Sequence, residues 1–195
     1  MQLLVSHTSP YARKCRVLVR ELGLQDKVEE IDAHPFEDGE TLLKANPLGR
    51  VPCLVRDGKG YPESTLIGEI LHEEAGYPWR YDWEDQRVEA LASGLLDLAV
   101  GRRVEMVRDT AIYSDYWIGR REAGIARALD VLESEAKRGL ETDTMGALTI
   151  AIAVSYLDFR FQESDWRSGR AKLSALYEVW AARPSFQLTK PPADA

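Results

Sequence analysis

The first part of the chain alternates between short apolar runs and amphipathic stripes. Residues 2–6 form an apolar run that predicts a short buried strand. Apolar residues then recur at helical spacing, at Tyr11, Cys15, Leu18 and Leu22. Ser9 and Pro10 come just before this stripe, and these residue types are favoured at the N-cap and the first position of a helix. The pattern therefore predicts a strand followed by a helix that begins at Ser9 and Pro10.

Further strands and helices are predicted up to Gly76. They are, in order, a strand at 28–31, a short helix at 40–45, a hairpin at 53–62 and a helix capped by Ser64 or Thr65. Pro62 places the second hairpin strand at a sheet edge, because proline cannot donate a hydrogen bond to a neighbouring strand. The order β-α-β-α-β-β-α predicts an α/β, thioredoxin-like domain over residues 1–76.

The strand pattern disappears in the second part of the chain. Residues 77–86 are aromatic and polar without periodicity, which is typical of a linker. Four helical stripes follow, and residues 148–156 are apolar nearly all round, which favours a central, buried helix. We therefore expect an all-helical domain over residues 87–195.

Composition narrows the class of protein. The 195 residues include 25 basic and 32 acidic side chains, a net charge of −7, which argues against a nucleic-acid or anionic-membrane partner. No apolar run approaches the length of a membrane span, and residues 1–20 have no apolar signal core, so we expect a cytoplasmic protein. Two cysteines, Cys15 and Cys53, and three scattered histidines show no metal-ligand spacing, so no metal site is expected.

Residues 46–64 hold the strongest candidate for a binding site. A turn leads into the strand through Val51 and Pro52, and X-Pro bonds adopt cis at modest cost. A cis bond there would leave the Val51 N–H and C=O open to the backbone of a peptide-like ligand. Glu63 and Ser64 then open a helix, whose free N–H groups suit a carboxylate. Together these features predict a small peptide ligand.

With both halves in view, the chain resembles the cytosolic glutathione S-transferase family, particularly its bacterial, serine-type members. Four motifs carry the resemblance, at residues 8–14, 46–52, 63–64 and 183–186. The resemblance implies glutathione as co-substrate, a small-molecule electrophile, a homodimer and a role in detoxification.

The resemblance also implies a role for individual glutathione-binding residues. Val51, before cis Pro52, would receive the cysteinyl backbone of glutathione. Glu63 would meet the γ-glutamyl ammonium, and Ser64 would bind the γ-glutamyl carboxylate. Arg50 would reach the glycine carboxylate.

Ser9 determines which reaction class the resemblance implies. The nucleophile is the thiolate, and a free thiol with a pKa near 8.5 is mostly protonated at neutral pH. A serine O–H that donates to the sulfur stabilises the anion, so Ser9 predicts transfer of the glutathione thiolate to an electrophile. Members with cysteine at this position form mixed disulfides instead.

Several alternatives stay open. Ser9 could act only as a helix cap, and Thr8 is a competing hydroxyl for thiol activation. The chain could also be a non-catalytic binding or regulatory module of the same family, or a glutathione-dependent peroxidase or reductase.

One segment departs from the family pattern. The family follows a capping Ser or Thr with Asp three residues later in the buried helix of the second domain. Here Thr149 stands at the capping place, but Ile152 replaces the aspartate. The departure concerns folding of the helical domain rather than the glutathione site.

Overall fold

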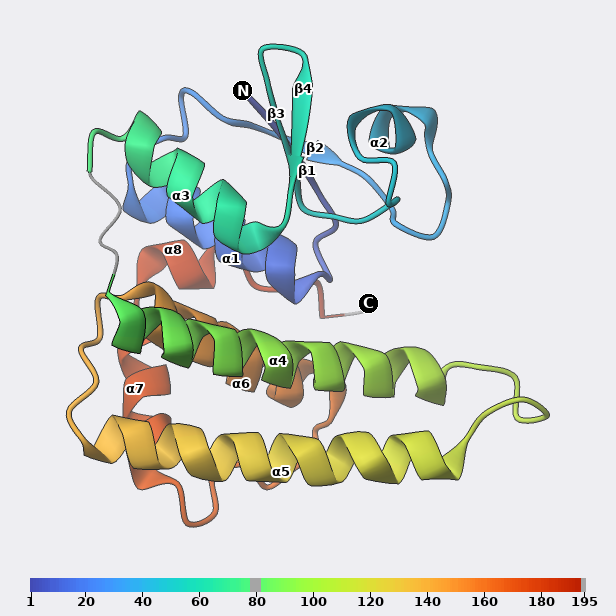
Figure 1. Ribbon diagram of the computed structural model, residues 1–195, viewed down its shortest axis with the longest axis vertical. Coiled ribbons are helices and arrows are strands. Elements are labelled where there is room, and N and C mark those ends of the chain that lie inside the picture. Colours follow the sequence, from blue (N-terminus) through green and yellow to red (C-terminus); the bar gives the residue numbers. More distant parts are fainter. Residues whose placement is uncertain (78–81, 194–195) are drawn as a thin grey trace. The chain divides into compact units, whose positions relative to one another are not determined.

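The computed structural model describes residues 1–77 and 82–193. Its contacts divide the chain into two compact units, one made of residues 1–80 with 183–195 and the other of residues 81–182. Figure 1 shows the elements of each. The first unit contains β1 (Gln2–Val5), α1 (Pro10–Glu21), β2 (Glu29–Asp32), α2 (Glu40–Ala45), β3 (Cys53–Arg56), β4 (Lys59–Pro62), α3 (Ser64–Glu74) and α8 (Pro184–Gln187).

The strands of the first unit form one mixed sheet in the order β2-β1-β3-β4. β1 runs parallel to β2 and antiparallel to β3, while β3 and β4 form the predicted hairpin with Pro62 in the edge strand. Helices α1 and α3 cover one face of the sheet and α2 lies on the other (Figure 1). The thioredoxin-like order expected from the sequence is confirmed.

A part-buried ionic cluster ties α1 to β2. Glu30 Oε2 lies 2.6 Å from Arg16 Nε, and Glu30 Oε1 lies 2.5 Å from Arg20 Nη1. Burial alone would raise the pKa of Glu30, but hydrogen bonds from Arg20 and Arg16 outweigh it and hold that pKa below its usual range. The crossover helix is therefore tied to the edge strand by charge as well as by its apolar face.

The C-terminal segment belongs to the first unit, which differs from the expected helical domain of 87–195. α8 packs on α1: Arg13 Nη2 donates to the Phe186 carbonyl oxygen (3.0 Å), and the guanidinium lies 4.1 Å from the centre of the Phe186 ring. Arg183 Nη1 also pairs with Glu21 Oε2 at 2.8 Å. The Phe186 ring is buried against a cation of α1, and this contact draws the segment into the first unit.

The second unit is helical, as expected, and contains α4 (Trp83–Met106), α5 (Asp115–Lys137), α6 (Met145–Arg160) and α7 (Ala171–Ala181). α4 begins at Trp83, with Asp82 as its N-cap, so the linker expected at 77–86 ends earlier than predicted; its residues 78–81 lie outside the described part. Every residue from Met145 to Leu157 is buried, which confirms α6 as the central helix of this unit.

The helix starts of the second unit are capped partly from other helices. α6 begins at Met145 rather than near Thr149, because Thr144 Oγ1 accepts from Ala147 N (3.1 Å) and Asp85 Oδ1, on α4, accepts from Gly146 N (2.9 Å). Thr149 lies inside α6 and donates to the Met145 carbonyl oxygen (2.7 Å). The start of α6 is therefore capped by Thr144 and by a carboxylate from a neighbouring helix, and Ile152 lies inside the helix.

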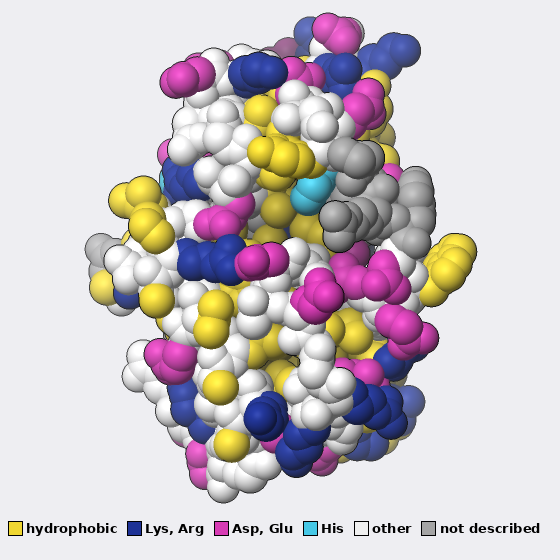
Figure 2. Space-filling view, turned by 90° about the vertical axis from the view of Figure 1, so that its left-hand side faces the viewer, with side chains coloured by type: hydrophobic (Ala, Val, Ile, Leu, Met, Phe, Trp, Pro, Cys, Tyr) yellow, Lys and Arg dark blue, Asp and Glu magenta, His cyan; other side chains and the backbone are white. Residues whose placement is uncertain are grey.

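Surface charge is mixed in sign. Figure 2 shows basic and acidic side chains interspersed on the face that it presents. None of the helices in the described ranges combines the length and apolar character needed to cross a bilayer.

Glu133 provides a test of capping between helices. Its carboxylate accepts from Leu173 N (2.9 Å) and Lys172 N (3.3 Å) at the start of α7, whose own N-cap residue makes no capping bond through its side chain. Glu133→Gln is expected to lower the free energy of unfolding by about 1–2 kcal/mol, because it removes the charge from buried hydrogen bonds. Urea unfolding followed by circular dichroism measures this change, and Glu178→Gln, at an exposed position of α7, serves as the control.

The same carboxylate predicts a pH dependence. Burial would raise the pKa of Glu133, but the N–H groups of Leu173 and Lys172 and the ammonium of Lys137 hold it below its usual range. A group with a lowered folded-state pKa stabilises the fold above its unfolded pKa. The stability difference between Glu133→Gln and the native chain should be full at neutral pH and shrink as the pH falls below about 4.3. A difference that stays constant down to the folded-state pKa would contradict this role.

Candidate functional site

The register of the sheet brings three predicted site segments to one end of the first unit. Cys53 of β3 lies opposite Leu4 of β1 and opposite Pro62 of β4. Val51 and Pro52 come directly before Cys53, and the chain from Pro62 continues into Glu63 and Ser64. The loop from β1 to Ser9 leaves from the same end, so the structure gathers these segments at one edge of the unit.

Ser9 is the N-cap of α1, and its Oγ accepts a hydrogen bond from Ala12 N at 3.2 Å. This bond uses an oxygen lone pair and leaves the hydroxyl proton available to donate. The neighbouring Thr8 Oγ1 lies 3.2 Å from Ser6 Oγ, so the Thr8 hydroxyl already forms a hydrogen bond with the Ser6 hydroxyl. Ser9 can cap the helix and donate to a ligand at the same time, and both hydroxyls are part-buried.

The Val51–Pro52 peptide bond is cis. Both side chains are buried, whereas that of Arg50 is exposed. The turn before them is held by Asn46, whose Nδ2 donates to the Arg50 carbonyl oxygen (2.8 Å) and whose Oδ1 accepts from Leu48 N (3.1 Å). Asn46 is buried and orients the turn that the sequence predicts before Val51, although the sequence interpretation did not assign this positioning role to its side chain.

The start of α3 has a shape suited to an anion. Glu63 occupies the N-cap position with φ +74°, and its side chain makes no capping hydrogen bond. Ser64, buried, is therefore the first helical residue rather than the cap expected from the sequence. A positive φ in a residue other than glycine costs about 1–3 kcal/mol and is concentrated at functional sites. A helix start without a bond from its N-cap side chain suits a ligand carboxylate.

α1 contacts the start of α3 through two consecutive side chains that the sequence interpretation did not assign to the site. Lys14 Nζ lies 3.4 Å from Thr65 Oγ1, and Cys15 Sγ lies 3.8 Å from the Ser64 carbonyl oxygen. Both side chains are fully buried. The two helix starts are thereby fixed relative to each other.

Within the described ranges, no group of three or more His, Cys, Asp or Glu side chains is arranged to hold a metal ion. Burial raises the pKa of the Cys53 thiol, which disfavours the reactive thiolate there.

Comparisons with known proteins identify the family of the chain. The family model for the glutathione S-transferase N-terminal domain matches residues 8–75. The uncharacterized GST-like protein YibF of Escherichia coli (strain K12) is 35% identical over 202 residues, which cover 98% of this chain and 99% of YibF. The chain therefore belongs to the glutathione S-transferase family, and the resemblance inferred from its motifs is confirmed.

Two solved bacterial structures are similar over nearly the full length. A glutathione S-transferase from Methylobacillus flagellatus KT with glutathione bound is 27% identical, with a TM-score of 0.89 over 98% of this chain and 99% of that chain. A glutathione transferase family member from Pseudomonas fluorescens Pf-5 with bound S-(propanoic acid)-glutathione is 32% identical, with a TM-score of 0.86 over 98% of this chain and 100% of that chain.

Proposed function

We propose that the protein is a glutathione transferase that adds the thiolate of glutathione to a small electrophile. The observation that carries the proposal is the gathering of Ser9, the Val51–Pro52 bond and the start of α3 at one end of the first unit. The bound glutathione of the Methylobacillus flagellatus relative supports the choice of ligand.

Glutathione would be held along its whole length. The backbone N–H and C=O of Val51 would pair with the cysteinyl residue, as in strand addition. Ser64 would bind the γ-glutamyl carboxylate through its hydroxyl and N–H at the positive end of α3, and the exposed Glu63 carboxylate would meet the ammonium. The exposed Arg50 would pair with the glycine carboxylate.

Ser9 would then stabilise the thiolate form of the glutathione sulfur. Its hydroxyl proton, not used by the cap bond, would donate to the thiolate, and the partial positive charge at the start of α1 would add to the stabilisation. The thiolate would form a carbon–sulfur bond with the acceptor, which would either release a leaving group with its electron pair or, if unsaturated, take up the electron pair of its π bond and then a proton. Serine at this position disfavours the mixed-disulfide route of a reductase, since only a cysteine could form that bond.

The acceptor in this proposal is a small molecule. The S-(propanoic acid)-glutathione bound to the Pseudomonas fluorescens relative supports small acceptors. We include in the proposal a cytoplasmic homodimer with a role in detoxification, as the family resemblance implies.

Calorimetry with glutathione tests this proposal through Ser64. Ser64→Ala is expected to weaken glutathione binding by about 1–3 kcal/mol, because one charge-assisted hydrogen bond is lost. Ser134→Ala, on the exposed side of α5, is the matched control and should bind as the native chain does. Absence of binding by the native chain would contradict the proposed function, whereas equal affinity in Ser64→Ala would remove only this contact.

A further inference from the structure

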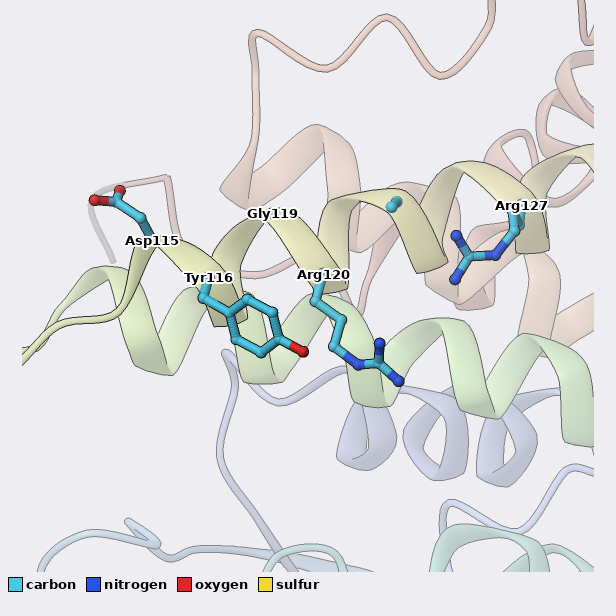
Figure 3. Close-up of a pocket in the computed structure, with 6 residues that line it drawn as sticks. Asp115, Tyr116, Gly119, Arg120 and Arg127 are labelled. Atoms are coloured by element: carbon cyan, nitrogen blue, oxygen red, sulfur yellow. The ribbon is translucent and has the colours of Figure 1, made fainter.

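Two polar features of the surface differ in how specific they are. The pocket in Figure 3 is lined by residues of a single helix, α5, and all six of them are exposed. It is therefore an open helix surface rather than an enclosed site. The first unit holds a more specific feature beside the proposed thiol-activating serine, where His7 Nε2 lies 2.9 Å from Asp32 Oδ1.

His7 lies in the tight turn that joins β1 to α1. Ser9 N donates to the Ser6 carbonyl oxygen (3.0 Å), which closes a four-residue turn with His7 and Thr8 at its two middle positions. The hydroxyls of Thr8 and Ser6 form a further hydrogen bond inside the turn (3.2 Å). The turn ends at Ser9, whose carbonyl oxygen accepts from Arg13 N (3.0 Å) as α1 begins. The position of Ser9 therefore depends on the geometry of this turn.

Asp32 offers the turn an anchor on the neighbouring strand. It is the last residue of β2 and pairs in register with Val5, the last residue of β1. Ala33 N donates to the Val5 carbonyl oxygen (2.8 Å), so the two strand ends are held together directly before the turn. Among the polar contacts that side chains of the turn make within the described ranges, only the one between His7 and Asp32 reaches another strand.

The His7–Asp32 pair is exposed, with 41% of the His7 side chain and 76% of the Asp32 side chain accessible to solvent. Exposed ion pairs contribute little to overall stability, because water screens the charges and ordering the side chains costs entropy. The pair therefore acts locally, on the range of conformations that the turn can adopt. It needs a proton on Nε2, which both the imidazolium and one neutral tautomer provide.

We propose that His7 is a positioning residue of the transferase, which together with Asp32 fixes the turn that orients the Ser9 hydroxyl. The proposal deepens the proposed function and rests on it, since Ser9 stabilises the thiolate there. The Ser9 oxygen already accepts from Ala12 N, so the direction of its O–H is set by the backbone that the turn holds. His7 acts through Ser9 and not by contact with the sulfur.

A double-mutant cycle on the pKa of the thiol of bound glutathione tests this role. His7→Ala is expected to raise that pKa toward the free value and to lower kcat/KM roughly two- to tenfold, as for one lost polar contact. The dissociation constant of glutathione should stay near its native value, because Val51 and Ser64 are unchanged. In the Ser9→Ala background His7→Ala should have no further effect on the pKa, since the residue through which it acts is absent.

A conservative variant separates the contact from the imidazole ring. The amide of His7→Gln can donate to Asp32 from about the place of Nε2, so this variant should keep the thiol pKa and kcat/KM near their native values. His72→Ala, at the opposite end of α3 from Ser64, is the matched control for loss of a histidine and should change neither quantity.

Amide hydrogen exchange without glutathione tests the anchor independently of the transferase proposal. The Ser9 N–H is protected by its bond to the Ser6 carbonyl oxygen. His7→Ala and Asp32→Ala should each speed its exchange roughly two- to tenfold, because the turn opens more often without the anchor. Nuclear magnetic resonance measures the exchange rate, and His72→Ala should leave it unchanged.

Two results would overturn the proposal. Native exchange at Ser9 in both anchor variants would show that the pair does not fix the turn. An equal effect of His7→Ala on the thiol pKa in the native and Ser9→Ala backgrounds would show that the imidazole acts on the sulfur without Ser9. An unshifted thiol pKa on the native chain would refute the proposed function itself, and the exchange rates, measured without glutathione, distinguish that failure from a failure of the anchor.

Discussion

Gly60→Ala is expected to lower the free energy of unfolding by at least about 3 kcal/mol. A Cβ at this position would lie 1.8 Å from the carbonyl oxygen of Ala45 and 2.7 Å from its carbonyl carbon. Both atoms belong to the backbone at the end of α2, so the clash cannot be relieved by rotating a side chain. Denaturant unfolding monitored by circular dichroism measures the loss.

Gly94→Ala is the matched control for this prediction. Gly94 lies in the interior of α4, and a Cβ there would meet nothing within 4 Å. Because alanine is a better helix former, this variant should be as stable as the native chain or more stable by up to about 1 kcal/mol. A Gly60→Ala protein as stable as Gly94→Ala would show that α2 does not pack on β4 as described.

The close contact between Gly60 and the backbone of Ala45 also affects the candidate site. Ala45 is followed by Asn46, the buried side chain that orients the turn before Val51. The close approach of Gly60 to the end of α2 therefore positions the segment that carries the cis bond. Glutathione binding by any folded Gly60→Ala protein should be weaker than that of the native chain.

Ser9→Ala is expected to have the largest effect on catalysis. Because the proposed Ser9 hydroxyl donates to the thiolate, its removal should raise the pKa of the thiol of bound glutathione. It should also lower kcat/KM roughly ten- to hundredfold, as expected for a lost hydrogen bond to a charged group. Steady-state kinetics with chlorodinitrobenzene as acceptor measures the rate. The rise of the rate with pH should move to higher pH in the variant, since the thiol then deprotonates at a higher pH.

Two controls separate thiol activation from helix capping. Thr144→Ala removes a comparable N-cap, from α6, and should cost about 1 kcal/mol of stability while leaving the pH profile unchanged. Thr8→Val removes the competing hydroxyl and should leave kcat close to its native value. If Thr8→Val lost activity and Ser9→Ala did not, the assignment of the activating hydroxyl would be reversed.

Local patterns were sufficient to predict most of the first unit. The Ser9 and Pro10 helix start, the hairpin and the edge position of Pro62 all follow from rules about caps, turns and missing N–H donors, and the structure agrees with each. These features depend on neighbouring residues, which is why a single sequence shows them.

Features that depend on distant residues were not predictable in this way. The C-terminal segment joins the first unit because Arg13 contacts the ring and the carbonyl oxygen of Phe186. This contact spans 173 positions of the sequence, and no local pattern indicates it. At the start of α6, Asp85 on another helix accepts from Gly146 N, a contact in addition to the local N-cap Thr144 that the sequence does not indicate. The positive φ of Glu63 likewise arises from the path between β4 and α3 rather than from its residue type.

The candidate site combines both kinds of feature. The residues proposed for glutathione were identified from motifs, and the structure gathers the segments that carry them at one end of the sheet. The supporting contacts from Asn46 and Lys14 became visible only in three dimensions. Local motifs thus identify candidate ligand contacts, while the fold supplies the residues that hold them in place.

The pKa of the thiol of bound glutathione is the decisive measurement for thiol activation by Ser9. Ultraviolet absorbance of the thiolate, followed as a function of pH for glutathione on the native chain and on Ser9→Ala, gives this value. On the native chain this pKa is expected to lie clearly below the value of about 8.5 for a free thiol, and in Ser9→Ala it is expected to return toward that value. An unshifted pKa on a native chain that binds glutathione would contradict the role of Ser9 and, with it, the proposed transferase mechanism.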